Sequence, residues 1–560
     1  ATGHLIWDVK MDFTRKARWV KDGHKTSDPE GSNYAGVVSR ESVRIAFTYA
    51  ALNDLDIWAC DIQNAYIQAP TSEKHYIICG PEFGEHVGKR ALIRRALYGG
   101  KCAGRDYWVH LRSCMQFLGF TTCKADADVR MREKKKSDGT IYWEYVLLYV
   151  DDCLCISVDP ESIIRNEIGK YFIVKEPSIG PPDIYLGGKV RKVELETGVE
   201  CWAFSSSQYV QEAVRNVRKC LEKRYEEKND HLKFHLPKKA PAPMSNDYRP
   251  EIDISKELDA TDAAYYQSLI GIVRWMVELG RVDICCEVSM LSSCLALPRE
   301  GHLQQLLHMF SYLEKKHNTE MVFDPSVPHI DQSMFPRQDW SNTVYATADC
   351  MTSDGKLERK LPEDLPEAHG RGFVMRVFVD SDHAGDTVTR RSRTGFLVYL
   401  NNALVYWTSK KQTGVETSSF GSEFMAMKHA TEYVRGLRYK LRSMGIPVDD
   451  CTYIFGDNQS VLANTTAPHS QLKKKSNSVA YHHCREGVAF DEWRTAYINT
   501  NLNPSDLLTK NLPSGEKRNR FCGQLLHHLA QTEIKNVIPA AAAAGVTVPL
   551  RWIKTIMSLL

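Results

Sequence analysis

Hydrophobic positions in the first part of the chain predict one helix and several short strands. Residues 40–52 repeat apolar side chains at intervals close to 3.6, which is typical of a helix. Residues 57–61, 143–149 and 153–157 are short apolar runs, which predict buried strands. Only residues 150–152 separate the last two runs, so we expect a hairpin with a tight acidic turn.

The middle of the chain changes pattern twice. Residues 221–262 are charged and contain several prolines, which predicts a linker or an extended strap. Residues 263–316 carry apolar side chains at helical spacing, and residues 325–370 are rich in loop-forming residues. We therefore expect a helical region after the strap and loops after the helices.

A second alternation of strands with a helix begins near Gly372. Its apolar runs predict strands at residues 374–379, 396–399, 404–408 and 452–455. Residues 422–443 predict a long helix with apolar side chains along one face. The chain after residue 515 contains a run of alanines and has no pattern that predicts a role.

Composition narrows the class of protein. The chain has 560 residues, of which 43% are hydrophobic, and this is enough for several cores. No apolar run reaches about 18 residues, so we expect no membrane contact. The 16 cysteines form no Cys-x-x-Cys pair, which favours reduced thiols in an intracellular protein over a zinc site. The net charge of +3 is too small to indicate nucleic-acid binding by itself.

Three carboxylates lie at the ends of the first set of predicted strands. Asp61 ends one strand, and Asp151 and Asp152 lie on the hairpin turn. If these strands are neighbours, the carboxylates converge and repel one another, and a bound divalent cation compensates for the repulsion. The alternative is ordinary turn chemistry, because acidic residues are common at turns.

Four further carboxylates occupy similar places in the second alternation. Asp380 ends its first strand, Glu423 lies in the first turn of the long helix, and Asp457 follows the next strand. Asp506 begins another predicted helix after Pro504. These positions can meet at one edge of a sheet. Alternatively, Glu423 and Asp506 only stabilise helix N-termini, by roughly a few tenths of a kcal/mol each.

The order of short motifs resembles that of copia-type retrotransposon polymerases, which are reverse transcriptases. Residues 149–152 match the family's Tyr-Val-Asp-Asp catalytic box, and residues 61–66 resemble the box with its first metal-binding Asp. Further similar segments are residues 16–20, 96–101, 185–188, 266–271 and 281–284. The resemblance implies that Asp61, Asp151 and Asp152 are catalytic metal ligands.

The same resemblance implies several substrate contacts. Tyr66 stands where the family excludes the ribose 2′-hydroxyl, and Lys16 and Arg18 are candidates for binding the triphosphate. The remaining implied substrate-binding residues are Tyr149, Gly99 and Lys101.

Residues in the second alternation resemble the ribonuclease H region of the same family. The similar segments are residues 379–386, 407–412, 418–424, 457–460 and 504–510. This resemblance implies that Asp380, Glu423, Asp457 and Asp506 are catalytic metal ligands. With these segments, the similarity covers nearly all of residues 10–515.

The chain departs from the family pattern at a few positions. Residues 100–104 read Gly-Lys-Cys-Ala-Gly where the family has Leu-Lys-Gln-Ala-Pro, which affects the support of the template base. Ser476 replaces a family histidine, and Gly421 replaces a family glutamate. None of the seven implied carboxylates is changed.

The resemblance predicts an α+β architecture, with a right-hand polymerase of fingers, palm and thumb, a connection segment, and a ribonuclease H-like αβ domain. We assign fingers and palm to residues 1–190, and the thumb-like region and linker to residues 191–250. The helical thumb or connection region is residues 251–370, the ribonuclease H-like domain residues 371–515, and the tail residues 516–560.

The implied function is RNA- and DNA-directed DNA synthesis with cleavage of RNA in RNA–DNA hybrids. Each active site is expected to use two Mg²⁺ ions, with Mn²⁺ as the alternative. The expected partners are an RNA template, a DNA primer and product, the hybrid and dNTPs, and a homodimer is left open. The expected location is a cytoplasmic retrotransposon particle, with the nucleus as a second site. The alternatives are a nucleic-acid-binding protein without catalysis and a structural subunit of a particle.

Overall fold

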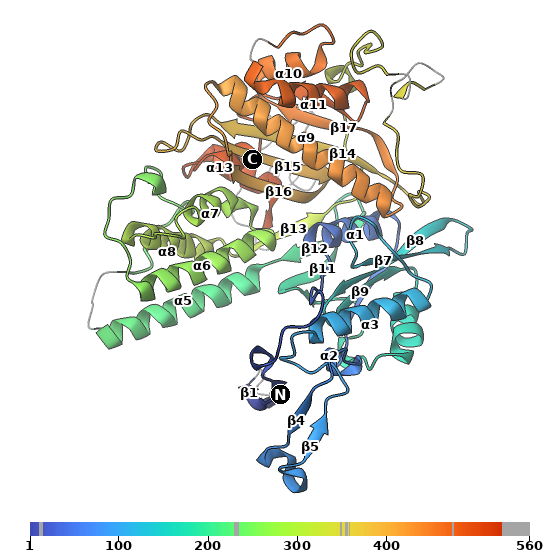
Figure 1. Cartoon of the computed structure of the whole chain (residues 1–560). Helices are drawn as coiled ribbons and strands as arrows, with labels where there is room; N and C mark the ends of the chain where they lie inside the picture. The colour runs from blue at the N-terminus through green and yellow to red at the C-terminus, as the bar shows by residue number, and fades with distance from the viewer. Residues whose placement is uncertain are drawn as a thin grey trace. The chain divides into compact units, whose positions relative to one another are not determined.

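The computed structural model describes residues 1–9, 15–228, 234–347, 350–352, 357, 359–472 and 475–528. The chain divides into two compact units (Figure 1). The first comprises Ala1–Ala46, Asn53–Pro182 and Ser443–Gly445. The second comprises Phe47–Leu52, Asp183–Arg442 and Ile446–Leu560. Among the described residues, no helix has the length and apolar character needed to span a membrane.

An antiparallel sheet of five strands, in the order β3-β9-β8-β7-β6, is the centre of the first unit. The strands are β3 (Asp56–Asp61), β6 (Thr121–Thr122), β7 (Val129–Lys135), β8 (Ile141–Tyr149) and β9 (Asp152–Ser157). Helix α3 (Ala103–Phe117) buries Tyr107, Leu111 and Met115 in one core with Val146 of β8. The three strands predicted around the acidic turn and near Asp61 are confirmed.

Smaller elements complete the first unit. Its other α-helices are α1 (Arg40–Leu52), which continues into the second unit, and the short α2 (Ala65–Gln68) and α4 (Pro160–Ser162). Strands β1 (Gly3–Val9) and β2 (Arg15–Lys21) form one hairpin, and β4 (Tyr76–Ile78) and β5 (Arg90–Leu92) form another. The helix predicted at residues 40–52 is confirmed.

The second unit contains a five-stranded sheet in the order β16-β15-β14-β17-β18. Its strands are β14 (Phe373–Asp382), β15 (Arg393–Leu400), β16 (Ala403–Lys411), β17 (Val448–Gly456) and β18 (Trp493–Tyr497). The pairs β14–β15 and β15–β16 are antiparallel, whereas β14–β17 and β17–β18 are parallel. Helix α9 (Ser419–Ser443) lies across this sheet (Figure 1) and buries its predicted apolar face, which includes Phe424, Val434 and Leu441. The predicted strand–helix alternation is therefore confirmed.

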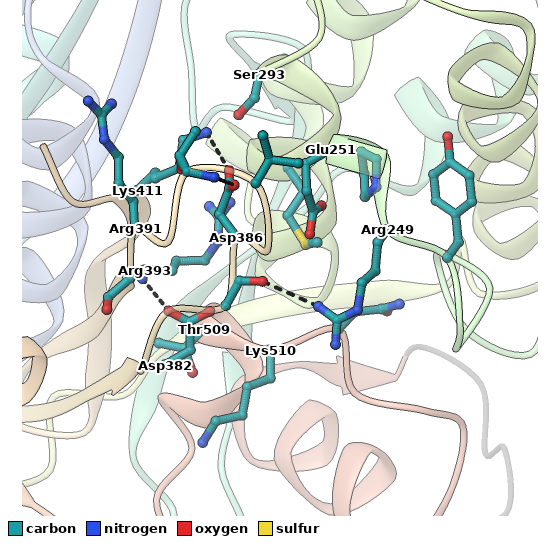
Figure 2. A pocket seen from close by; sticks show the side chains of 18 of the residues that line it. Arg249, Glu251, Ser293, Asp382, Asp386, Arg391, Arg393, Lys411, Thr509 and Lys510 are labelled. Atoms are coloured by element: carbon teal, nitrogen blue, oxygen red, sulfur yellow. Dashed lines mark hydrogen bonds and ion pairs between the residues drawn. The ribbon is translucent and has the colours of Figure 1, made fainter. Parts of the chain in front are cut away.

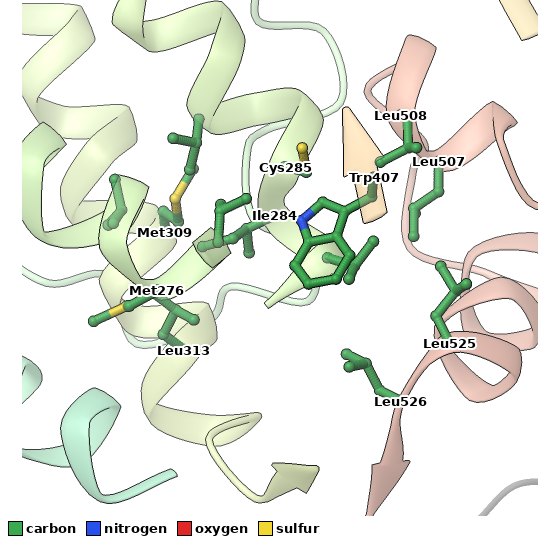
Figure 3. Packing of buried hydrophobic residues seen from close by; sticks show 14 of the residues in the cluster. Met276, Ile284, Cys285, Met309, Leu313, Trp407, Leu507, Leu508, Leu525 and Leu526 are labelled. Atoms are coloured by element: carbon green, nitrogen blue, oxygen red, sulfur yellow. The ribbon is translucent and has the colours of Figure 1, made fainter. Parts of the chain in front are cut away.

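Helices α10 (Gln459–Thr466) and α11 (Ser478–Ala489) connect β17 to β18, and α12 (Asp506–Thr509) follows β18. A helical region precedes this sheet in the chain and shares a core with it. Its helices are α5 (Ser207–Lys228), α6 (Ala260–Glu278), α7 (Cys285–Ser292) and α8 (Glu300–Lys315). Figure 3 shows Met276, Met309 and Leu313 of these helices in one cluster with Trp407 of β16.

The prediction of a linker across residues 221–262 is wrong for its first part, because α5 continues to Lys228. Val210, Val214 and Val217 of this helix are buried in the shared core, and Leu221 packs against it. Most of residues 221–228 are charged, so the sequence of this last part of the helix resembles a linker.

The chain after residue 515 forms defined structure up to residue 528. Helix α13 (Glu516–Leu525) is followed by β19 (His527–His528), which pairs with β13 (Thr319–Phe323). This pairing places β19 at the edge of a second sheet of the unit, ordered β10-β11-β12-β13-β19. The remaining strands of that sheet are β10 (Ile184–Tyr185), β11 (Gly188–Glu194) and β12 (Glu200–Ser205).

Arg518 joins α13 to the helical region through buried polar contacts. Its Nη1 donates to the Glu287 carboxylate at 3.0 Å, and its Nη2 donates to the Asp283 carbonyl. The side chains of Arg518 and Glu287 are at most 2% exposed. Since a buried charge needs a partner, this pair holds the end of the described chain in place.

We expect Arg518→Met to weaken the docking of α13 by about 3–5 kcal/mol, because the variant leaves the Glu287 carboxylate buried without its partner. Amide hydrogen exchange in α13 and α7 should then become much faster. Asn519→Ala is the matched control, because Asn519 lies on the same helix and is exposed. Equal exchange in the two variants would show that the pair does not hold α13.

Two candidate metal centres

The turn between β8 and β9 carries the first acidic pair. Tyr149 pairs with Asp152 in the register of these strands, so Val150 and Asp151 form the turn. Val150 has a φ of +56°, a region that β-branched residues rarely adopt and that costs about 1–3 kcal/mol. The backbone N–H of Ile62 donates to the Asp151 carbonyl at 2.8 Å and ties the turn to the end of β3.

Asp61 lies directly opposite Asp152, because β3 pairs with β9 in that register. One Asp61 oxygen, Oδ2, forms an ion pair with Lys175, a residue that no sequence motif singled out. The other oxygen, Oδ1, is buried and has no hydrogen-bond donor among the described residues. The strand register therefore leaves a buried carboxylate oxygen at the end of the sheet that can accept a cation.

The electrostatics of this end of the sheet also favour a cation. Burial, followed by the charges of Asp151 and Asp61, raises the pKa of Asp152 to about 6, against the opposing charge of Lys175. Carboxylates that repel one another are stabilised by a bound divalent ion. The buried oxygen of Asp61 and this repulsion together make the residues a good fit for Mg²⁺.

We expect Asp152→Asn to stabilise the metal-free chain above pH 6 and to have no effect below pH 3.8. The raised pKa means that the folded chain retains a proton that the unfolded chain loses between about 3.8 and 6. Above that window the charged side chain opposes folding, and below it the carboxyl is neutral in both states. In thermal unfolding in EDTA, the melting temperature of the variant should rise by about 2–4 °C for each kcal/mol of added stability. An unchanged melting temperature at pH 8 would contradict this account, and Mg²⁺ should stabilise the parent more than the variant.

Aromatic side chains lie close to this acidic turn. Tyr66 of α2 stacks on Tyr98 with ring centroids 4.8 Å apart. The ring centroid of Tyr107 lies 5.7 Å from that of Tyr66. The Arg18 guanidinium lies over the Tyr98 ring at 4.9 Å. The charge of Asp151 acts on Tyr66 and Tyr98 and raises the pKa of both, after the larger effect of burial. The structure thus brings Tyr66 and Arg18 to one place, with Tyr98 and Tyr107 as neighbours that sequence reasoning missed.

Gly99 lies where the chain crosses β2 closely. Its φ is +83°, and a Cβ atom there would lie 2.1 Å from the Lys21 carbonyl oxygen. Only glycine fits this position without moving the backbone. Gly99 therefore supports the loop that carries Tyr98, which stacks on Tyr66.

The other residues predicted to contact substrate are Lys101, Tyr149 and Lys16. The Lys101 ammonium donates to Asp28 at 2.7 Å and to the Thr26 carbonyl at 2.9 Å. Tyr149 is the last residue of β8. Lys16 lies in β2, but its side chain lies outside the described part of the chain. The binding roles of these residues stay predictions.

A second acidic group forms at the edge of the other sheet. Strands β14 and β17 are parallel neighbours, and Asp380 and Asp457 lie at or just after their carboxyl ends. Glu423, in the first turns of α9, completes the group, and ligand oxygens of the three residues all lie within 4.8 Å of one another. Within the described ranges, no other three acidic, histidine or cysteine residues have ligand atoms this close together. The carboxylates of Asp61, Asp151 and Asp152 are therefore farther apart than those of the second group.

The carboxylates of this second group also repel one another, and burial adds to the cost of their negative charge. Burial, together with the charges of Asp506 and Asp457, raises the pKa of Asp380 to about 7, although Lys510 opposes this rise. Burial, followed by the charges of Asp380 and Asp457, raises the pKa of Glu423 well above its ordinary value. A divalent cation fits this donor set, because it offsets both the burial and the repulsion.

Asp506, the fourth predicted carboxylate, lies beside this group rather than within it. It begins α12, and its buried carboxylate accepts hydrogen bonds from Lys510 and Lys517. The Lys510 ammonium is also 3.5 Å from Asp380 Oδ2, and the Thr509 hydroxyl donates to Asp380. Lys510 and Thr509 end the motif at residues 504–510, so the sequence contained a signal for them, but none marked Lys517.

Known proteins resemble this chain in sequence and, in part, in structure. A crystal structure of ribonuclease H1 from Halobacterium salinarum NRC-1 aligns with 25% of this chain and 95% of its own, at 16% identity and a TM-score of 0.20.

Sequence relatives cover much more of the chain. The retrovirus-related Pol polyprotein of transposon TNT 1-94 from Nicotiana tabacum is 24% identical over 508 residues, which is 88% of this chain. The corresponding polyprotein of transposon RE1 from Arabidopsis thaliana is 24% identical over 506 residues, or 89% of the chain. The chain spans only 32% and 29% of the length of these two relatives.

One protein family matches the first part of the chain. Residues 5–218 match the family described as reverse transcriptase (RNA-dependent DNA polymerase), and this range contains the β8–β9 turn and Asp61. The resemblance to copia-type polymerases that the motifs predicted is therefore confirmed. The chain is therefore similar to retrotransposon Pol polyproteins over most of its length, and its match to the reverse transcriptase family covers residues 5–218.

Proposed function

We propose that this chain is an RNA- and DNA-directed DNA polymerase that also cleaves the RNA strand of RNA–DNA hybrids. The main support for the polymerase activity is the strand register that sets Asp61 opposite Asp152, next to the tight turn that contains Asp151. These residues lie within residues 5–218, which match the reverse transcriptase family. The convergence of Asp380, Glu423 and Asp457 supports the ribonuclease H activity.

In this proposal, Asp61, Asp151 and Asp152 hold the cations for synthesis, and Asp380, Glu423 and Asp457 hold those for hydrolysis. When bound, Mg²⁺ or Mn²⁺, two per site, would activate the attacking hydroxyl or water and neutralise the charge on the phosphate. Asp506 acts beside the second group, where Lys510 and Lys517 balance its charge.

The proposed substrate contacts surround the first centre. Tyr66 excludes the ribose 2′-hydroxyl, since its ring is held in place by Tyr98 and Tyr107. Arg18, whose guanidinium lies over Tyr98, binds the triphosphate of the incoming dNTP. The further partners are an RNA template, a DNA primer and the hybrid product. An intracellular particle and a homodimer belong to the same proposal.

Two assays on the purified chain test this function. Extension of a DNA primer on an RNA template with dNTPs and Mg²⁺ tests synthesis, and release of labelled RNA from a hybrid tests hydrolysis. Both activities should vanish in EDTA. Hybrid binding without either activity, at saturating Mg²⁺ or Mn²⁺, would instead support a nucleic-acid-binding protein that keeps only the fold.

A further inference from the structure

The second unit contains a cavity of about 430 Å³, and Figure 2 shows residues that line it, among them Asp382, Thr509 and Lys510. Three segments from different parts of the second unit line it. They are the strap around residues 246–251, the end of α7, and the loop between β14 and β15. Thr509 and Lys510 also line the cavity, and both contact Asp380. Two residues of the cavity wall are therefore direct neighbours of the Asp380 group.

Positive charge predominates in the wall of this cavity. Five of its lining residues are Arg or Lys, and three are Asp or Glu. Lys411 is paired with Asp386 at 2.8 Å. Within the described part of the chain, no carboxylate forms a side-chain ion pair with Arg249, Arg391 or Arg393. The exposed guanidinium groups of Arg249 and Arg391 are thus available to bind an anion.

The positions of these arginines suit a ligand that enters from solvent. Arg249 and Arg391 are exposed, and Arg249 donates to the Gly385 carbonyl at 3.3 Å. Arg393 is 7% exposed, and its Nη1 donates to the hydroxyls of Ser289 and Ser409 at 2.6 and 3.3 Å. Guanidinium groups bind phosphate oxygens in a bidentate way, so a phosphate can contact the mouth while the fixed Arg393 attracts it from below.

We infer that this cavity binds a phosphodiester of the nucleic-acid strand that reaches the Asp380 group. Ligand sites commonly have volumes of about 300–1,000 Å³, so the cavity has room for a nucleotide unit as well as its phosphate. A strand rather than a free nucleotide is favoured, because Thr509 and Lys510 join the cavity wall directly to the carboxylates. The inference rests on the proposed hybrid cleavage, and it assigns Arg249, outside the β14–β18 sheet, a part in holding that substrate.

The double variant Arg249→Gln/Arg391→Gln tests the inference, because both side chains are exposed and their loss should not disturb folding. Arg390→Gln is the matched control, since Arg390 is an exposed neighbour that does not line the cavity. Binding of a fluorescent RNA–DNA hybrid to the full chain is measured in Ca²⁺, over a range of salt concentrations. We expect binding about tenfold weaker in the double variant. The slope of log affinity against log salt should fall by about 0.7–0.9 for each lost phosphate contact.

Several outcomes would overturn the inference. Equal weakening by the double variant and by Arg390→Gln would show a general effect of charge. A loss of inorganic phosphate or 5′-AMP binding, with hybrid binding unchanged, would assign the cavity to a free phosphate compound. Binding needs no cleavage, so arginine-dependent binding by a parent that cleaves nothing would contradict the nuclease proposal alone. Efficient cleavage that is indifferent to both arginines would contradict the cavity assignment alone.

Discussion

Asp151→Asn is expected to reduce primer extension about a thousandfold, whereas hybrid cleavage stays unchanged. Asparagine preserves the size of the side chain but removes the charge that a divalent cation requires. Charge stabilisation by a bound metal contributes several kcal/mol, and about 4 kcal/mol corresponds to a factor of roughly 10³ in rate. Single-turnover extension on a primed RNA template, with Mg²⁺ varied, measures the effect.

The turn between β7 and β8 offers a matched control for this variant. Asp138 lies on that turn, is exposed, and accepts a hydrogen bond from the Thr140 N–H, which asparagine can also accept. Asp138→Asn should therefore extend primers like the parent. If Asp151→Asn also extends primers at the parental rate, the first acidic group is not the polymerase site.

Asp457→Asn is expected to reduce hybrid cleavage about a thousandfold without changing primer extension. Asp457 is one of the three residues whose ligand oxygens lie within 4.8 Å of one another, so its loss removes a third of the donor set. Cation binding should also weaken as pH falls below about 7 in the parent, because protons compete for Asp380 at its raised pKa. Cleavage of labelled RNA in a hybrid, at limiting Mg²⁺ and varied pH, measures both effects.

Asp449→Asn is the control for this second variant. Asp449 lies on the same strand, β17, but near its other end and exposed to solvent. Its loss should leave cleavage unchanged. Cleavage that persists in Asp457→Asn would mean that the RNA is cut elsewhere, and cleavage independent of pH at limiting Mg²⁺ would contradict the role of Asp380.

The extent of sequence-based prediction differs between the two centres. At the first centre, two apolar runs with a short gap predicted the hairpin, although its turn is only Val150 and Asp151 because Asp152 already pairs in β9. No pattern in the sequence predicted the ion pair of Asp61 with Lys175. At the second, all four carboxylates were named in advance. The structure groups three of them and sets Asp506 apart, because Lys510 and Lys517 bind it.

Sequence alone determined the local elements and the order of the motifs, and hence the relationship to retrotransposon Pol polyproteins. These depend on periodicity, turn chemistry and residue order, which act over a few neighbouring positions. Only the tertiary structure decided that Asp61 faces Asp152, that α13 docks through Arg518, and that a basic cavity adjoins Asp380. Each of these joins residues distant in the chain, and strand register and helix packing rather than local pattern bring them together.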